Sequence, residues 1–506
     1  LGDVYKRQLV WCNQKGEEKV ITFGEMKELS LKMCNVISSY GVKKGDFVMS
    51  MLNRRWEYWV LVVACCKMGV VLIPATHMLT PKDVAYRVNE AGVKLLFATE
   101  EEDVAEHISL ALPDCKNLKG VLSVNGAHFD NLDEKLENAP AEFSFDARPN
   151  PRDLMLVYFT SGTTGMPKMV MHDFLYPLGH VFTAKYWQDV VDDGLHFTMA
   201  ETGWAKCSWG KIYGQWISGT AVFAYDYHGR FTPTDVLPLV QKYGITTFCA
   251  PPTIYRFLVK EDLSSFDLSS IKHCSTAGES LNPEVFKQFE KATGLKIYEG
   301  FGQTEGTVML GTFKYLSPVT GSLGKPSPLY DVRLIDDDEN EVKPGEEGEI
   351  AILKSENQCG LVAGYFKDEA RTAALKNDVY FHTGDLAYQD KDGWFWYVGR
   401  KDDIIKSSGY RIGPFEVESA LMEHPAVLEC AITAVPDDLR GQIVKATIVL
   451  TKNYQPSDAL VKELQNHVKK VTAPYKYPRI VEFVKELPKT TSGKIRRVEI
   501  RENDKK

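Results

Sequence analysis

Residues 153–160 (DLMLVYFT) form an apolar run that leads directly into a loop rich in glycine and hydroxyl side chains. An apolar run of this length predicts a buried strand. In the loop, glycines let the backbone approach a ligand, hydroxyls donate hydrogen bonds and Lys168 adds positive charge, so a polyphosphate site is expected. The loop lacks the GxxxxGK[ST] pattern of P-loop NTPases, and a flexible connector is the alternative. The candidate phosphate-binding residues are Thr160, Ser161, Gly162, Thr163, Thr164, Gly165 and Lys168.

Helical signals elsewhere favour an α/β fold with parallel sheets. Residues 281–293 predict a helix with Asn282 as its cap and Pro283 in its first turn, and residues 296–298 predict the next strand. Strand–helix–strand order of this kind is typical of parallel sheets. Near the C-terminus Ser457 opens a second predicted helix. Its expected apolar face consists of Leu460, Val461, Leu464, Val468 and Val471.

Composition excludes several classes of protein. With 506 residues the chain can form about three domain-sized units, at roughly 150 residues each. Its net charge of -8 argues against a nucleic-acid partner or an anionic membrane surface. The longest apolar stretch, residues 59–66, is eight residues long, so we expect no membrane span.

Cysteine and histidine patterns indicate the compartment and argue against zinc. The ten cysteines contain no CxxC pair and the 11 histidines no HxxxH pair, which argues against a structural zinc site or a redox motif. Free thiols and the polar start of the chain predict a cytoplasmic protein. Residues 3–8 resemble a translated sequencing adapter, so we expect residues 1–8 to be non-native and the true amino terminus to be missing.

Charge divides the chain into two parts. Residues 401–506 carry 19 Lys+Arg and 15 Asp+Glu, a net of about +4, and residues 1–400 carry 41 and 53, a net of about -12. Secondary-structure signals also change after residues 399–403 (GRKDD). We therefore predict a large domain over residues 1–400 and a small one over residues 401–506, with the boundary at Lys401 and Asp402.

Six further motifs occur in a fixed order and carry a family resemblance. Together with the phosphate loop, the chain resembles the acyl-adenylate-forming superfamily, which includes acyl-CoA synthetases, luciferases and peptide-synthetase adenylation domains. The resemblance covers nearly the whole chain, and chance cannot explain all motifs at family spacing. The motifs are STAGES (275–280), YEGFGQTE (298–305), YFHTGD (380–385), GRKDD (399–403), SGYR (408–411) and PKTTSGK (488–494).

The resemblance implies a fold, cofactors and a reaction. The expected fold is a large N-terminal domain of parallel-sheet αβ subdomains plus a small β-barrel-like part, followed by a small mobile α+β C-terminal domain. A carboxylic acid would attack ATP to give acyl-AMP and pyrophosphate, and coenzyme A would then take the acyl group. The small domain would turn about a hinge at Asp402 between these steps.

The resemblance also assigns roles to residues. Thr304 would bond the α-phosphate, Glu305 would offer a carboxylate oxygen to Mg2+, and Lys494 would bridge the substrate carboxylate and the α-phosphate. Asp385 would accept the ribose hydroxyls, although alone it could be a turn residue. The basic residues around Lys494 form a solvated tail or meet the CoA phosphates. The other implied nucleotide- and CoA-binding residues are Gly278, Glu279, Ser280, Glu299, Gly300, Phe301, Gly302, Arg400, Gly409 and Arg411.

The acid is predicted to be longer than acetate. Segments around Trp204 and Gly278 resemble medium-chain acyl-CoA synthetases, and Gly302 stands where acetate-specific relatives carry a pocket-closing tryptophan. Each buried methylene is worth about 0.8 kcal/mol, so a short- to medium-chain acid of about four to eight carbons is expected. Branched short acids and benzoate remain alternatives. Trp204 either gates the pantetheine tunnel or belongs to the core.

Other functions within and beyond the superfamily are less consistent with the sequence. Loading of a carrier protein is an alternative, although we expect such an enzyme to have an adjoining carrier domain and the 506 residues contain none. A luciferase-like oxygenase is disfavoured by the CoA-synthetase type of small domain. A nucleotide sensor would be expected to lose Lys494 or Glu305, and both are present. The sequence leaves the oligomeric state open between a monomer and a homodimer.

Overall fold

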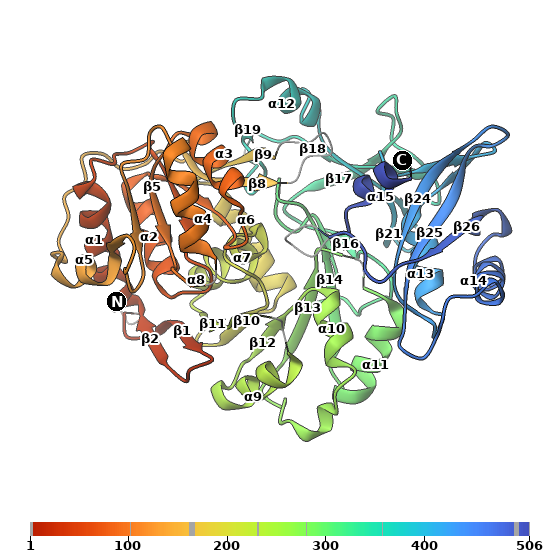
Figure 1. Cartoon of the computed structure of the whole chain (residues 1–506), viewed down its shortest axis with the longest axis horizontal. Coiled ribbons are helices and arrows are strands. Elements are labelled where there is room, and N and C mark those ends of the chain that lie inside the picture. Colours follow the sequence, from red (N-terminus) through yellow and green to blue (C-terminus); the bar gives the residue numbers. More distant parts are fainter. Residues whose placement is uncertain are drawn as a thin grey trace. The chain divides into compact units, whose positions relative to one another are not determined.

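The computed structural model describes residues 4–101, 103–160, 167–229, 232–279, 281–356, 358–489 and 495–504. Contacts within the chain form two compact units (Figure 1). The first contains Leu1–Glu279, Gln288–Pro318 and Ser355–Ala373; the second contains Ser280–Lys287, Val319–Lys354 and Ala374–Lys506. The second unit therefore also takes in residues that precede Lys401, and the functional boundary at Lys401 and Asp402 stays a prediction.

One sheet of the first unit carries the predicted phosphate-loop strand. Strand β8 pairs in parallel with β4 and antiparallel with β9, and the remaining central pairs are parallel. Apolar side chains from its strands and from helices α3 (Pro81–Ala91) and α4 (Val104–Ala111) form one core. The strand order is β19 (Gly364–Tyr365), β9 (Lys168–Asp173), β8 (Leu154–Thr160), β4 (Val71–Pro74), β3 (Phe47–Met51), β5 (Val93–Ala98), β6 (Gly120–Ser123) and β7 (Asp130–Asn131).

The second sheet of this unit is also mainly parallel. Only its outer pairs, β1 with β2 and β14 with β15, run antiparallel. Within the unit its strand order is β15 (Leu310–Gly311), β14 (Ile297–Phe301), β13 (His273–Ala277), β12 (Thr247–Cys249), β10 (Leu195–Thr198), β11 (Ala221–Asp226), β1 (Arg7–Asn13) and β2 (Glu18–Thr22).

Helices of this unit connect the strands of the two sheets. They are α1 (Phe23–Ser39), α2 (Glu57–Met68), α3 (Pro81–Ala91), α4 (Val104–Ala111), α5 (Leu132–Asn138), α6 (Tyr176–Phe182), α7 (Ala205–Gly210), α8 (Tyr213–Ile217), α9 (Pro233–Tyr243) and α10 (Pro252–Leu258), with short turns η1 (Leu112–Asp114), η2 (Thr183–Trp187) and η3 (Leu263–Ser265). The residues of α11 (Pro283–Thr293) and α12 (Glu369–Leu375) are divided between the two units.

The second unit contains two smaller sheets. An antiparallel sheet has the order β17 (Asp331–Ile335), β18 (Glu347–Leu353), β20 (Tyr380–Gln389) and β21 (Phe395–Arg400). The other has the order β23 (Tyr410–Ile412), β22 (Ile405–Ser407), β25 (Gly441–Leu450) and β24 (Val427–Asp437), with β26 (Ile480–Phe483) parallel to β25. The short β16 (Lys325–Pro326), α13 (Pro414–Met422), α14 (Asp458–Val471), η4 (Pro474–Lys476) and α15 (Arg497–Asn503) complete it.

The predicted fold class and local elements are confirmed. The fold is mixed α/β, with parallel sheets in the large N-terminal part and an α+β arrangement at the C-terminus. Helix α11 begins at Pro283, and Asn282 accepts a 2.8 Å hydrogen bond from the Glu284 backbone N–H. The side chain of Ser457 caps α14. One expected core position is wrong: Val471, in the last turn of α14, is 43% exposed. Within the described ranges, no helix is long and apolar enough to cross a membrane.

Candidate active site

The predicted phosphate loop closes a hairpin in the first unit. Thr160 at the end of β8 lies opposite Lys168 at the start of β9. The remaining loop candidates, Ser161, Gly162, Thr163, Thr164 and Gly165, lie outside the described residues. The hairpin therefore brings one hydroxyl and one ammonium group to the same end of the sheet.

Glu305 is held beside this hairpin by a residue that the sequence did not single out. Strand β19 pairs with β9, and its Tyr365 donates a 2.9 Å hydrogen bond from the phenol to Glu305 Oε1. The Lys168 ammonium lies 5.4 Å from the centre of the Tyr365 ring. The backbone N–H of Val362 donates a 2.7 Å bond to the Glu305 carbonyl. Tyr365 thus connects the candidate metal ligand with the candidate phosphate-binding lysine.

Thr304 is fixed through its backbone by a buried histidine. His172 Nε2, on β9, lies 2.8 Å from the Thr304 carbonyl oxygen. Because a carbonyl only accepts, Nε2 carries the proton and donates it. Burial lowers the pKa of His172 to about 4, so the imidazole is neutral near pH 7. His172 therefore holds the backbone of the Gln303–Thr304–Glu305 segment without adding charge.

The candidate adenine residues lie at the ends of two adjacent strands. Gly300 on β14 is the register partner of Ala277 on β13, directly before Gly278. A Cβ at Gly300 would lie 2.6 Å from the Trp187 ring, so only glycine allows this close approach. Gly278 has φ +102°, which also favours glycine. Flat backbone at both strand ends is consistent with the predicted purine slot.

Three other candidates of this region differ in surroundings. Glu299 is buried, at 6% exposure, and Phe301 is half-buried. Glu279 lies 3.5 Å from Arg256 and accepts a 3.2 Å hydrogen bond from the Thr253 hydroxyl. Ser280 lies outside the part of the chain that the structure describes.

Two groups lie in the direction in which a side chain at Gly302 would project, and the size of the acyl pocket stays a prediction. A Cβ at Gly302 would lie 2.3 Å from the Thr307 carbonyl oxygen and 2.5 Å from the Trp209 ring. Trp209, on α7, is 5% exposed and packs with Trp187 in an edge-to-face pair. An indole from elsewhere in the chain therefore lies close to where a tryptophan at position 302 would project. Trp209 could not be predicted from the sequence, since it belongs to no motif of the site.

Trp204 is half-exposed and does not belong to the core. It stands before α7, and its indole N–H donates a 3.1 Å hydrogen bond to Glu201 Oε2. Two residues further on, the Lys206 ammonium donates a 2.7 Å bond to the Ala277 carbonyl. The segment that carries Trp204 is thus tied to the end of β13, next to the candidate adenine residues.

The candidate ribose site is a separate cluster in the second unit. Asp385 on β20 is 4% exposed and is the register partner of Arg400 on β21. Its Oδ1 accepts a 2.9 Å bond from the Tyr397 phenol, and its Oδ2 lies 3.3 Å from Arg400. Arg400 also donates a 3.0 Å bond to the Thr383 carbonyl. Arg400 therefore lies next to Asp385, as predicted, and Tyr397 is a further partner that the sequence did not indicate.

Three of the remaining candidates of this unit, Asp402, Gly409 and Arg411, are exposed. Asp402 lies between β21 and β22, 3.6 Å from Arg400 Nε. Gly409, at φ +83°, forms the turn between β22 and β23, and its Cβ would meet no described atom within 4 Å. Arg411 is exposed on β23. Lys494 lies outside the described residues.

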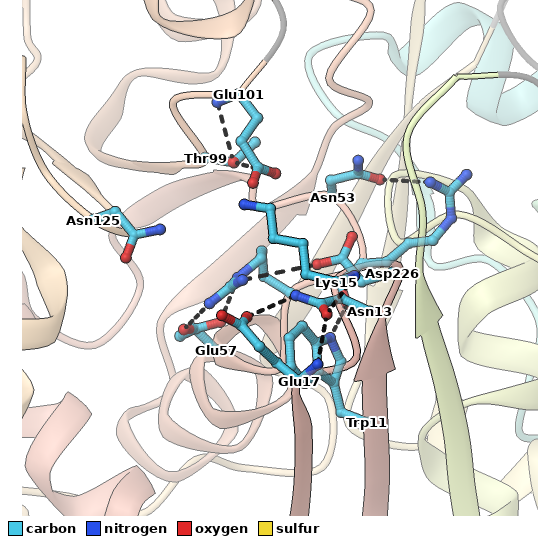
Figure 2. A network of polar contacts seen from close by, with 12 residues as sticks. Trp11, Asn13, Lys15, Glu17, Asn53, Glu57, Thr99, Glu101, Asn125 and Asp226 are labelled. Carbon is cyan, nitrogen blue, oxygen red and sulfur yellow. Dashed lines mark hydrogen bonds and ion pairs between the residues drawn. The ribbon is translucent and has the colours of Figure 1, made fainter.

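A buried polar network also lies in the first unit, away from any sequence motif. Arg55 pairs with Glu57 at 3.0 Å and with Asp226 at 3.9 Å. Figure 2 labels these two carboxylates, Glu57 and Asp226. Its guanidinium lies 5.0 Å from the centre of the Trp11 ring. Burial raises the pKa of Glu57 to about 7, although Arg55 opposes the shift. This network lies where β1, β3 and β11 end.

Comparison with known proteins gives consistent matches. Residues 4–366 match the AMP-binding enzyme family, and residues 416–494 match the AMP-binding enzyme C-terminal domain. The mitochondrial acyl-coenzyme A synthetase ACSM3 of Mus musculus is 43% identical over 503 residues, which is 98% of this chain and 86% of the relative. The mitochondrial acyl-coenzyme A synthetase ACSM4 of Homo sapiens is 42% identical over 505 residues, with the same 98% and 86% coverage.

A solved structure extends the match to three dimensions. The anthranilate CoA ligase AuaEII in complex with anthranoyl-AMP superposes with a TM-score of 0.90 at 27% sequence identity. The superposition covers 99% of this chain and 95% of that one.

The location predicted from the sequence is wrong. Both relatives are named as mitochondrial proteins, which contradicts the expected cytoplasmic location. The physical reason is that free cysteines indicate only a reducing environment, and such an environment does not distinguish one intracellular compartment from another.

Proposed function

Because this chain belongs to the AMP-binding enzyme family and is an AMP-forming acyl-CoA synthetase, we propose that its acid substrate is a short- to medium-chain carboxylic acid of about four to eight carbons. The acid carboxylate attacks the α-phosphorus of ATP, a new O–P bond forms and pyrophosphate leaves. The thiol of coenzyme A then loses its proton and attacks the acyl carbon, and AMP leaves.

The observation that carries the proposed site is the placement of Glu305. Its carboxylate is fixed by Tyr365 beside the strand that begins with Lys168. A half-buried carboxylate suits Mg2+, which prefers oxygen ligands. When bound, the ion would neutralise phosphate charge, and Lys168 would add a second positive charge to the same phosphates. No group of three or more metal-ligating side chains occurs among the described residues, so the ATP phosphates would supply more ligands to the ion than the protein does.

Thr304 would direct the α-phosphate. His172 holds its carbonyl, which restrains the backbone from which the hydroxyl projects. A hydroxyl donor fixed in this way stabilises charge that develops during attack, since it needs no reorganisation. We assign the cation that bridges the acid carboxylate and the α-phosphate to Lys494.

Asp385 would bind the ribose of ATP. Its carboxylate already accepts hydrogen bonds from Tyr397 and Arg400, which orient it. Gly278, Gly300 and their neighbours would accept the adenine.

The thioester step would use residues of the C-terminal domain and Trp204. We assign Gly409 and Arg411 to the pantetheine and phosphate groups of coenzyme A, Asp402 to the hinge, and Trp204 to the wall of the thiol path. The exposed glycine turn at Gly409 supports this assignment, because a ligand could approach its backbone closely. The names of the relatives support a mitochondrial location.

A panel of acids tests the proposal. Pyrophosphate release and acyl-CoA formation would be measured with acetate, butyrate, hexanoate, octanoate, isobutyrate, benzoate and anthranilate, each with and without coenzyme A. We expect the highest kcat/KM between four and eight carbons. Preference for anthranilate or benzoate would instead support an aromatic-acid ligase, which the anthranilate CoA ligase structure favours as second candidate. Preference for acetate would contradict both.

A further inference from the structure

One carboxylate joins the segment that carries Trp204 to the other sheet of the first unit. Glu201 follows β10, whereas Thr76 and His77 follow β4 of the sheet that carries the phosphate loop. Glu201 Oε1 accepts a 2.9 Å bond from the Thr76 hydroxyl and lies 2.8 Å from His77 Nδ1. Its other oxygen, Oε2, accepts the 3.1 Å bond from the Trp204 indole. One oxygen of Glu201 therefore binds the segment after β4, and the other binds the Trp204 indole.

The surrounding backbone leaves this segment little freedom. A Cβ at Gly203 would lie 2.4 Å from the Thr76 backbone nitrogen. The backbone segments at Gly203 and Thr76 are therefore in contact, and only glycine fits there. The Thr202 hydroxyl donates to the Asn53 carbonyl, and the buried Lys211 ammonium donates a 3.0 Å bond to the Ala200 carbonyl. Residues 200–203 are thus anchored on both sides.

The Trp204 side chain, by contrast, is not fixed by packing alone. It is only partly buried, whereas Glu201 is 8% exposed. A partly buried side chain can keep more than one rotamer unless a directed bond selects one. A hydrogen bond to a carboxylate is about twice as strong as one between neutral groups. The Glu201–Trp204 bond is therefore the directed interaction that selects the indole orientation.

The carboxylate is suited to this task because it stays ionised. Burial opposes its charge, but His77, Arg54 and Thr76 together hold the pKa of Glu201 below its ordinary value. An ionised carboxylate only accepts hydrogen bonds, so both oxygens face donors. A neutral amide in its place would turn an N–H toward one of those donors.

We infer that Glu201 is a positioning residue that fixes the Trp204 indole and thereby keeps the thiol path open for coenzyme A. The inference rests on the proposed place of Trp204 beside that path. It predicts that Glu201 acts on the thioester step through Trp204, whereas a residue that only joins two loops would act independently of the indole.

A double-mutant cycle on the thioester step tests this inference. Wild type, Glu201→Gln, Trp204→Phe and the double variant would be loaded with acyl-AMP, and acyl transfer would be followed by rapid quench over a range of coenzyme A concentrations. Loss of a hydrogen bond to a charged group predicts about a ten-fold or larger fall in kcat/KM for coenzyme A in each single variant. The double variant should lose no more than about three-fold beyond Trp204→Phe. Losses that multiply would contradict the inference, because the two residues would then act independently.

Two further variants separate positioning from stability. Thr76→Val removes a donor from Oε1 and leaves the indole bond on Oε2, so we expect kcat/KM for coenzyme A to change less than about three-fold. A loss equal to that of Glu201→Gln would overturn the inference.

If Glu201→Gln does not fold, a benzothienyl-alanine at position 204 removes only the indole N–H. Unchanged transfer in that variant would also overturn it. Failure of wild type to transfer acyl-AMP to coenzyme A would refute the proposed function itself, so the two failures can be told apart.

Discussion

The Tyr365 hydroxyl donates a 2.9 Å hydrogen bond to Glu305 Oε1, and the ring of the same tyrosine lies 5.4 Å from the Lys168 ammonium. One aromatic side chain thus stands between the candidate metal ligand and the candidate phosphate cation. Lys168 reaches it because β19 pairs with β9, and Glu305 is held next to β19 by the hydrogen bond from the Val362 backbone N–H to its carbonyl.

Glu305→Gln should weaken metal support of adenylation. The amide can still accept from Tyr365 but has no charge, so it is a poorer ligand for Mg2+. We expect the Mg2+ concentration for half-maximal pyrophosphate release to rise about ten-fold or more, by analogy with losses at metal sites. Tyr365→Phe is the matched control, because it keeps the carboxylate and removes only its orienting bond, and its effect should be smaller. Identical magnesium titrations of wild type and Glu305→Gln would remove Glu305 from the metal site.

Trp209 should set the length of acid that the enzyme accepts. Its ring occupies the space beside Gly302, so Trp209→Leu creates room there. Each additional buried methylene is worth about 0.8 kcal/mol, or about four-fold in kcat/KM. We expect the optimum in a series from acetate to decanoate to move toward longer acids by one or two carbons. An unchanged profile with intact folding would place the acyl chain elsewhere.

Gly302→Trp tests whether a side chain can be placed at position 302, next to Trp209 and Thr307. The sequence alone predicts a simple shift toward acetate or propionate. The structure instead predicts loss of stability as well, because even a Cβ would lie 2.3 Å from the Thr307 carbonyl. A lower melting temperature together with reduced turnover for all acids is the expected result. Wild-type stability with a clean shift to acetate would show that Trp209 and the Thr307 backbone move aside easily.

The sequence predicted the local features well and the long-range ones poorly. Strand β8, the Asn282 cap of α11 and the Ser457 cap of α14 depend on neighbouring residues, so their patterns were sufficient. Tyr365 and His172 were missed because strand pairing brings them to the motifs from distant parts of the chain. Trp209 was missed because it reaches Gly302 from helix α7, far away in the sequence. None of them stands in a sequence pattern that indicates chemistry. The expectation that Val471 is buried was wrong, because the periodicity of apolar residues does not show at which residue the end of a helix extends beyond the core.

Variants on different elements should damage different half-reactions. Lys494→Ala removes the cation at the developing charge and should lower acid-dependent pyrophosphate release about 100- to 1000-fold. Transfer from supplied acyl-AMP to coenzyme A should change little.

Asp402→Pro should spare adenylation more than thioester formation, because it stiffens the proposed hinge. Single-turnover assays of each half-reaction check this, and equal losses of both in each variant would argue for one fixed site without domain alternation.

Gly409→Leu should slow the thioester step selectively. A side chain there meets no described atom of the protein within 4 Å, so it would crowd only a ligand that approaches from outside. The matched control is Gly393→Leu, because Gly393 has φ +82° and Gly409 has φ +83°, which gives the same backbone strain. The expected result is a large rise in KM for coenzyme A in Gly409→Leu alone. Equal effects of both variants would assign the loss to strain.

Glu57 should make stability depend on pH. Its folded pKa of about 7 lies above its ordinary value, so the folded state binds more protons than the unfolded state between about pH 4.5 and 7. The free energy of unfolding therefore falls as pH rises through this window. Arg55 pairs with Glu57 and also with Asp226, and the more distant Asp133 raises the pKa of Glu57 further. Glu57→Gln should flatten the fall of melting temperature from pH 5 to 8. The same slope in wild type and variant would mean that Glu57 is ionised throughout.

The most direct test of the two-step account is a single-turnover experiment on the wild-type enzyme in excess over hexanoate, with ATP and Mg2+. Without coenzyme A, we predict one equivalent of pyrophosphate and one of enzyme-bound hexanoyl-AMP. Addition of coenzyme A should convert that adenylate to hexanoyl-CoA and AMP without further ATP. Pyrophosphate release that needs no acid, or an adenylate that persists after coenzyme A is added, would contradict the account.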